Sequence, residues 1–195
     1  MAYIKLWLTA YINPNRFAGE LQKRPAPYWG FIAALQRAMM DSLLLYLPLA
    51  LMGRIPPERS YLPLISDERY YGALVGIAPI VLLAEWLLAG ATMHLILRMS
   101  RLRSDIDQIL NISGFVALTI GSILLLWDWT WVALGGLSQN GLGISHLIID
   151  IWGIAIAAIA FKRILHVPVW LGVLLNLVGI MVALPMAIMF MRSPL

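Results

Sequence analysis

The chain has 195 residues, of which 61% are hydrophobic and only 12% are charged, and its mean hydropathy is +0.83. Soluble globular domains have about half apolar and about a quarter charged residues, so this composition excludes that class. The chain contains no cysteine, which excludes disulfides, iron–sulfur clusters and thiolate zinc sites. The formal charge of +4 is a modest basic excess whose placement along the chain matters more than its size.

The first twelve residues are too short to cross a bilayer but have the pattern of a helix in the membrane surface. Lys5, Thr9 and Asn13 recur at helical spacing and leave a wide apolar face. We expect this helix to lie parallel to the cytoplasmic surface, with Lys5 toward lipid phosphates and Trp7 and Leu8 in the acyl boundary. These three residues form the predicted membrane-surface anchor.

The remainder of the first thirty residues is a second short basic piece. The Asn-Pro-Asn sequence at 13–15 ends the first helix, and prolines at 25 and 27 close the second piece. A cleavable signal peptide is the alternative interpretation. A signal peptide carries its charge before the apolar stretch, whereas Lys5 lies inside it, and no small-x-small cleavage site follows. We therefore expect residues 1–30 to form an amphipathic, basic segment at the cytoplasmic membrane surface.

Residues 31–195 contain five apolar runs, each of about the length that crosses a bilayer as a helix. The runs are continuously apolar rather than alternating, which favours helices over barrel strands. The sequence therefore predicts an all-α membrane protein, a bundle of five transmembrane helices preceded by the amphipathic interfacial helix. The predicted spans are about 31–53, 72–97, 108–132, 144–161 and 169–191.

Small residues and prolines inside these spans make further predictions about packing. Small residues at four-residue spacing let helix backbones approach closely: Gly72 with Gly76, and Gly153 with Ala157. Each proline inside a span removes a backbone donor and should kink its helix, which is tolerated where a neighbour satisfies the freed carbonyl. These prolines are Pro48, Pro79 and Pro185.

The distribution of Lys and Arg predicts the orientation. With the N-terminus inside, ten basic residues fall on or near the cytoplasmic side and four on the other. This bias favours a cytoplasmic N-terminus and a C-terminus on the opposite side of a cell membrane. The ten are Lys5, Arg16, Lys23, Arg24, Arg37, Arg98, Arg101, Arg103, Lys162 and Arg163.

Ionisable residues inside spans are the candidate functional groups, because each is costly to bury in lipid. Arg37 and Asp41 are four residues apart on one helix face and can form an ion pair, or Asp41 can serve as a proton or cation site. Glu85 lies near the middle of the second span and needs a partner, for which Arg37 or Asn176 is suited. We predict an intramembrane polar cluster of these four residues.

A second group of polar residues lies near the outer ends of the third and fourth spans. His146 and Asp150 form an H-x-x-x-D pair on one helix face, and Asp128 should lie at similar depth. One histidine and two carboxylates could hold zinc or a similar divalent ion. A hydrogen bond between His146 and Asp150 is the alternative.

No motif for catalysis or for nucleotide binding occurs in the sequence. We therefore expect a protein that is not an enzyme and has no cofactor, although a haem or chlorophyll on His94 or His146 is a weaker alternative. The basic clusters are small and adjoin the spans, so nucleic acid is not an expected partner. The expected partners are the lipid bilayer and other membrane proteins, or further copies of the chain.

The layout resembles the Yip-domain family of small multi-span membrane proteins. The resemblance rests on the Asn-Pro-x-Arg-Phe segment at 13–17, the proline-rich approach to the first span and the Gln108–Phe115 opening of the third span. The final stretch, from Trp152 through Pro168 to Pro185, has the same general character. The resemblance implies five closely packed spans with almost no domain outside the membrane, and the short tail favours a prokaryotic-type member.

Two functions from different classes follow. The first is a non-enzymatic scaffold or accessory subunit of Yip-like architecture, which acts through its helix faces and its N-terminal segment. The alternative is a small proton-coupled transporter or permeation protein that uses the carboxylates of Asp41 and Glu85 near the membrane midplane. A scaffold should satisfy these charges in a dry core, whereas transport demands a water-filled cavity that reaches them.

Overall fold

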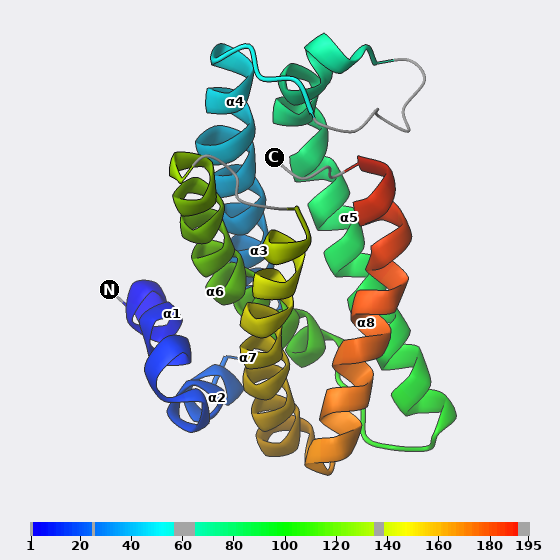
Figure 1. The fold of residues 1–195 in the computed structure, drawn as a ribbon. Helices are drawn as coiled ribbons and strands as arrows, with labels where there is room; N and C mark the ends of the chain where they lie inside the picture. Colours follow the sequence, from blue (N-terminus) through cyan, green and yellow to red (C-terminus); the bar gives the residue numbers. More distant parts are fainter. Residues whose placement is uncertain (1, 25, 57–64, 135–138, 191–195) are drawn as a thin grey trace.

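Figure 1 shows the computed structural model, which describes residues 2–24, 26–56, 65–134 and 139–190. Within these ranges the chain forms helices and no strand. The elements in chain order are α1 (Ala2–Ile12), α2 (Pro14–Gln22), α3 (Tyr28–Asp41), the π-helix η1 (Ser42–Tyr46), α4 (Leu47–Leu51), the short 3₁₀-helix η2 (Asp67–Arg69), α5 (Tyr70–Met99), α6 (Ile106–Ala133), α7 (Gln139–Leu165) and α8 (Val169–Phe190).

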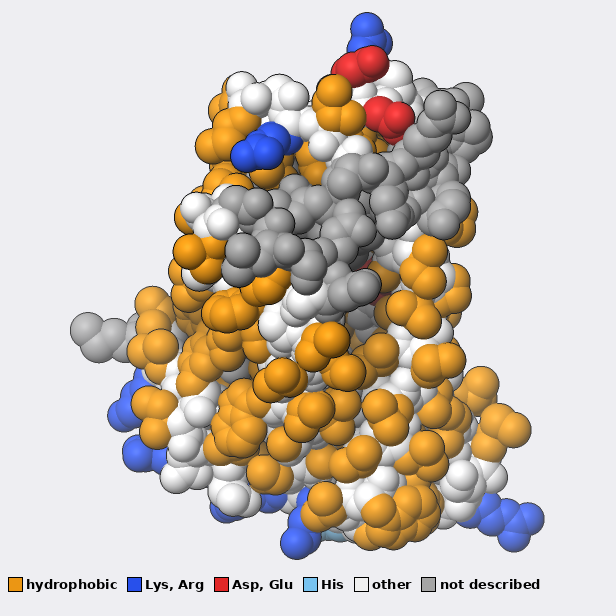
Figure 2. Space-filling view, in the orientation of Figure 1, with side chains coloured by type: hydrophobic (Ala, Val, Ile, Leu, Met, Phe, Trp, Pro, Cys, Tyr) orange, Lys and Arg blue, Asp and Glu red, His pale blue; other side chains and the backbone are white. Residues whose placement is uncertain are grey.

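Four stretches of helix are long and apolar enough to cross a membrane: Asp67–Met99, Ile106–Ala133, Gly141–Leu165 and Val169–Phe190. They confirm the prediction of an all-helical, multi-pass membrane protein, and they contain the last four predicted spans except residue 191, which lies outside the described residues. Figure 2 shows the matching surface, with hydrophobic side chains along the bundle and most charged ones near its ends.

The first predicted span, 31–53, falls on α3, η1 and α4, which follow one another without a break from Tyr28 to Leu51. The π-helical segment lies just before Pro48, which has no N–H to donate to the carbonyl of Leu44. The indole Nε1 of Trp129 on α6 donates to that carbonyl at 2.7 Å. A neighbouring helix therefore satisfies the acceptor that the proline leaves free, as predicted.

The same arrangement occurs at Pro79 inside α5. This proline cannot donate to the carbonyl of Val75, and the hydroxyl of Ser42 donates to it at 2.5 Å. Ser42 is the first residue of the π-helical segment, so the segment supplies the donor for the carbonyl that Pro79 leaves free. The prediction that neighbours satisfy these carbonyls is thus confirmed at two positions, and the predicted kinks stay predictions.

α3 and α6 cross with their backbones in contact. A Cβ atom on Gly30 would overlap the carbonyl of Leu110, and one on Gly114 would overlap the carbonyl of Gly30. The fully buried side chain of Asn111 ties the crossing together, because its Oδ1 accepts from the Gly30 N–H at 2.7 Å. Its Nδ2 donates to the carbonyls of Arg24 and Ala26, each at 3.0 Å. One amide therefore fixes the start of α3 and its approach against α6.

Buried side chains form two apolar cores. The first core joins α1, α2, α6, α7 and the adjoining parts of α3, α5 and α8, around residues such as Phe17, Phe115 and Phe161. The second core is smaller and joins η1, α4 and the first turns of α5, around Tyr46 and Tyr71. The polar residues of the bundle interior lie in or between these cores.

The N-terminal hairpin of α1 and α2 lies on the flank of the bundle, beside α6 and α7 (Figure 1). Asn13 caps α2, as its side chain accepts from the backbone N–H of Arg16 at 2.9 Å. Tyr3 stacks on Trp29 and donates to the side chain of Gln36 on α3 at 2.9 Å. One side of α1 is therefore held against the bundle.

The predicted anchor residues separate on this helix. Leu8 is half exposed and Lys5 is exposed, as a surface anchor requires. Trp7 is partly buried and packs against the first core. Its predicted place in the lipid acyl boundary stays a prediction.

The predicted small-residue contacts are confirmed for one pair and wrong for the other. Gly153 on α7 faces Ile120 on α6, where a Cβ atom would meet the isoleucine side chain, and Ala157 is fully buried. Gly72 and Gly76 on α5 have no described atom within 4 Å of an added Cβ. They leave an open face on α5 rather than a packed helix contact.

These glycines provide a matched stability test. Gly114→Ala should lower the free energy of unfolding by about 1–3 kcal/mol, because the new methyl group overlaps the α3 backbone. Gly76→Ala should raise it by about 0.5–1 kcal/mol, since the methyl group meets nothing and alanine favours the helix. Reversible unfolding in mixed micelles measures both values, and equal effects from the two variants would contradict the described crossing.

Candidate functional site

A cavity of about 330 Å³ lies where α3, α5, α6, α7 and α8 meet. Its walls are mainly apolar side chains and glycines, so they resemble the lining of a small-molecule site. The polar groups are few and come from all five helices: Arg37, Glu85, Ser113, Asp150 and Asn176. The cavity therefore brings together three of the four residues of the predicted polar cluster.

The fourth residue, Asp41, lies one helical turn from Arg37 and forms the predicted ion pair with it. Asp41 is buried, and the Arg37 guanidinium lies over Gly121 of α6, where an added Cβ atom would overlap it. Gly121 thus makes the room that the arginine occupies. Arg37 reaches the cavity with its charge already balanced by a carboxylate on its own helix.

Glu85 is the least satisfied group of the cavity. Only 8% of its surface is exposed, and its Oε1 atom has no hydrogen-bond partner. Among the described residues, neither Arg37 nor Asn176 pairs with it, which corrects the predicted partnership. Arg37 forms its ion pair with Asp41 instead. These two residues lie one turn apart on the same helix, so their contact does not depend on how two helices pack. Glu85 therefore presents a carboxyl group to the cavity without a fixed partner.

The predicted metal ligands do not converge. The Nε2 of His146 and the Oδ1 of Asp128 lie 2.8 Å apart and join α7 to α6. Asp150 instead lines the cavity, where it interacts electrostatically with Arg37 and His146. No group of three His, Asp or Glu residues in the described part of the chain is arranged to hold a metal ion. The predicted site fails because Asp150 faces the cavity and only two of its three ligands meet.

His94 lies apart from this cavity, near the end of α5. Its Nδ1 is 2.8 Å from the hydroxyl of Ser104, so it fastens the connection between α5 and α6. Both histidines considered from the sequence, His94 and His146, therefore have side-chain partners nearby. The cavity chemistry rests on the carboxyl groups of Glu85 and Asp150.

The arrangement can bind a positively charged group or a proton. Once Arg37 and Asp41 neutralise each other, Glu85 and Asp150 leave the cavity with two acidic groups and no further described Lys or Arg in its lining. Ile180 of α8, which lines the cavity, is 43% exposed. The volume of the cavity exceeds the space that a single water requires.

The sequence did not predict that Ser113, Gly121 and Asp150 line this cavity. A signal for Gly121 was present, because it follows Gly114 by seven residues and so shares its helix face. No signal for Ser113 stands out, since a serine inside a span commonly bonds its own backbone, and Ser113 does so to Leu110.

Comparison of the chain with models of protein families, with curated proteins and with solved structures finds no match. The resemblance to the Yip-domain family stays a prediction.

The ion pair supplies a test of the site's structure. Asp41→Asn should lower the free energy of unfolding by about 3–5 kcal/mol, because it leaves the Arg37 charge without its partner. The double variant Arg37→Met, Asp41→Leu should cost clearly less, since it removes both charges together. Unfolding in mixed micelles measures both, and an Asp41→Asn variant as stable as the natural chain would contradict the described pair.

Proposed function

We propose that the chain crosses the membrane five times, with α3, η1 and α4 together as the first span and the N-terminal hairpin on the cytoplasmic side. The uninterrupted helix from Tyr28 to Leu51 is long enough to cross hydrocarbon of about 30 Å. Most Lys and Arg residues lie at the end that carries α2, the α5–α6 connection and the end of α7. By the positive-inside rule this end is cytoplasmic and the C-terminus lies opposite.

The function that the site supports best is a small proton-coupled transporter or permeation protein. The observation that carries this proposal is Glu85, a carboxyl group buried inside the bundle, without a hydrogen-bond partner at Oε1, in the wall of a cavity of about 330 Å³. A purely structural charge would have a partner, because an unpaired carboxylate in a membrane costs several kcal/mol. Glu85 is therefore the binding group in this proposal.

The chemistry of the cavity suggests the class of solute. Two carboxyl groups favour a cation, and the apolar walls favour a solute with an apolar body. In the proposed cycle Glu85 holds either a proton or the cationic solute, so loading one releases the other. Arg37 is paired with Asp41, so the carboxyl group of Glu85 stays available to the proton or the solute.

A flux assay tests this proposal. The purified full chain is reconstituted in proteoliposomes with a proton gradient, and entry of the fluorescent organic cation ethidium is followed together with a trapped pH indicator. Glu85→Gln should abolish cation-coupled proton movement, because the amide neither binds nor releases a proton. Glu68→Gln is the matched control, since Glu68 is exposed and lies outside the cavity.

The assay has clear contrary outcomes. Equal coupled flux in the natural chain and in Glu85→Gln would contradict the role of this carboxyl group. Natural proteoliposomes that move no more cation than empty liposomes would contradict transport of this solute class. Gel filtration of each variant before reconstitution shows whether the chain is folded.

A scaffold or accessory subunit of Yip-like architecture is the second candidate. The open face of α5 at Gly72 and Gly76 favours it, because small residues at this spacing permit close helix association in membranes. Mass measurement in mild detergent tests this candidate: Gly72→Ile with Gly76→Ile should dissociate an assembly. A natural chain that is strictly monomeric and carries no partner would contradict it.

A further inference from the structure

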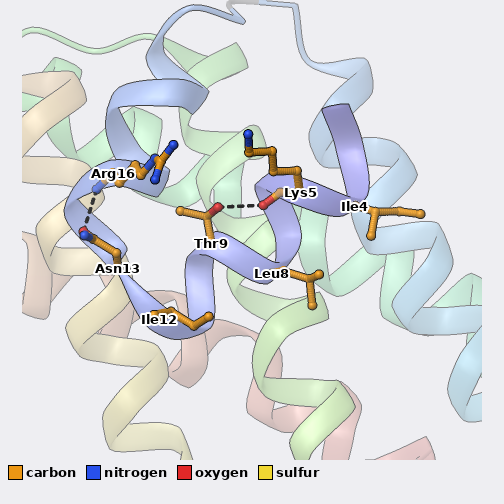
Figure 3. Close-up of a pocket in the computed structure, with 7 residues that line it drawn as sticks. All are labelled: Ile4, Lys5, Leu8, Thr9, Ile12, Asn13 and Arg16. Carbon is orange, nitrogen blue, oxygen red and sulfur yellow. Dashed lines mark hydrogen bonds between the residues drawn. The ribbon is translucent and has the colours of Figure 1, made fainter. Parts of the chain in front are cut away.

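A groove of about 530 Å³ runs along the outer side of the N-terminal hairpin (Figure 3). One wall is an apolar stripe of three exposed side chains at helical spacing on α1, namely Ile4, Leu8 and Ile12. Lys5, Thr9, Asn13 and Arg16 complete the lining. The groove thus combines an apolar wall with cationic side chains, and none of this stripe is covered by another part of the described chain.

The groove continues into a smaller polar cleft of about 180 Å³ between α1 and α2. The two share Lys5, Thr9 and Arg16, and the cleft adds Leu6, Glu20 and Arg24. Figure 3 shows the Lys5 and Arg16 side chains on the side where α1 and α2 face each other, with Ile4, Leu8 and Ile12 turned away from it. The charged and apolar parts therefore adjoin but do not mix.

The charges of the cleft favour an anion. Lys5, Arg16 and Arg24 face a single carboxylate, Glu20, and no described carboxylate forms an ion pair with any of the three. Glu20 itself pairs with Lys23 at 3.0 Å, and this contact lowers the pKa of the Glu20 carboxyl. Arg24 also lies over the ring of Trp29, at 4.8 Å from its centre, which holds it in place. The cleft keeps an excess of positive charge.

The hairpin is tied to one end of the bundle through α2. α2 packs against the last turns of α7, where Arg163 lies over Gly19. Asn111, in the second turn of α6, holds the carbonyls of Arg24 and Ala26. The α2 part of the hairpin is thus fixed beside the ends of α6 and α7, which the proposed topology places at the interface between hydrocarbon and water.

We propose that the groove between α1 and α2 binds one anionic phospholipid. Its phosphate lies between Lys5 and Arg16, and an acyl chain follows the stripe of Ile4, Leu8 and Ile12. A soluble phosphate would satisfy the cations and leave the apolar wall in water, whereas a lipid satisfies both. This site is separate from the cavity around Glu85 and does not depend on the transport proposed there, but it rests on the proposed topology, which puts the hairpin at the membrane surface.

Native mass spectrometry of the full chain from mixed micelles tests the proposal. The probes are phosphatidylglycerol and phosphatidylcholine with identical acyl chains. The natural chain should retain one phosphatidylglycerol, and Lys5→Gln with Arg16→Gln should weaken retention about 30-fold, since each basic residue near a lipid surface contributes about fivefold. Added salt should weaken retention by the natural chain as well.

A matched control distinguishes binding in this groove from an effect of the net charge of the protein. Arg98→Gln with Arg103→Gln removes two exposed cations at the α5–α6 connection, outside the groove, and should leave retention within about twofold of the natural value. Lys5→Arg with Arg16→Lys keeps both charges and should retain the lipid. The unfolding temperature of each variant without added lipid shows that the chain is folded.

Three outcomes would overturn the proposal. Equal retention of phosphatidylcholine would show that the cations do not select the headgroup. An equal loss in the control variant would show that net charge, not the groove, determines retention. Displacement of the lipid by millimolar inorganic phosphate in the same micelles would show that the cations take a free anion and that the apolar stripe contributes nothing.

Discussion

Where α3 crosses α6, two glycines bring the backbones into contact, and the other features of the bundle take their positions from that approach. Gly30 and Gly114 leave no room for a side chain between them, and Gly121, two turns further along α6, leaves room for the Arg37 guanidinium. The ion pair with Asp41 and the polar side of the cavity are thus placed by the same helix contact. In lipid the hydrophobic effect does not drive apolar helices together, because the lipid chains are as apolar as the side chains. Close packing of the backbones stabilises the association instead.

Three bonds inside the bundle join a polar group of one helix to a neighbouring segment. Asn111 accepts from the backbone N–H of Gly30 at the start of α3. Trp129 donates to the carbonyl that Pro48 leaves free, and Ser42 donates to the carbonyl that Pro79 leaves free. Each of these bonds crosses between helices and replaces water that is absent from hydrocarbon. The Oε1 atom of Glu85 has no such bond, and Glu85 lies in the wall of the cavity.

Features that depend on one segment could be predicted from the sequence, whereas features that depend on the contact between two segments could not. The last four spans, the break at Asn13 and the Arg37–Asp41 pair all follow from spacing along one helix. The partners of Glu85, Trp7 and Asp150 depend on which helix faces meet, and periodicity does not determine that for a helix that is apolar all round. Gly72 and Gly76 illustrate the same limit, since their spacing indicated close packing and the described chain places nothing against them.

The bond from Ser42 to Val75 joins the π-helical segment to the turn of α5 that precedes Pro79. Moving the π-helical segment by one residue would turn Ser42 about 100° around its helix and break this bond. The register of η1 and the carbonyl that Pro79 leaves free are therefore coupled through one hydroxyl group. A change of register in η1 would leave that carbonyl without a donor in a part of the chain where hydrocarbon offers no water to replace it.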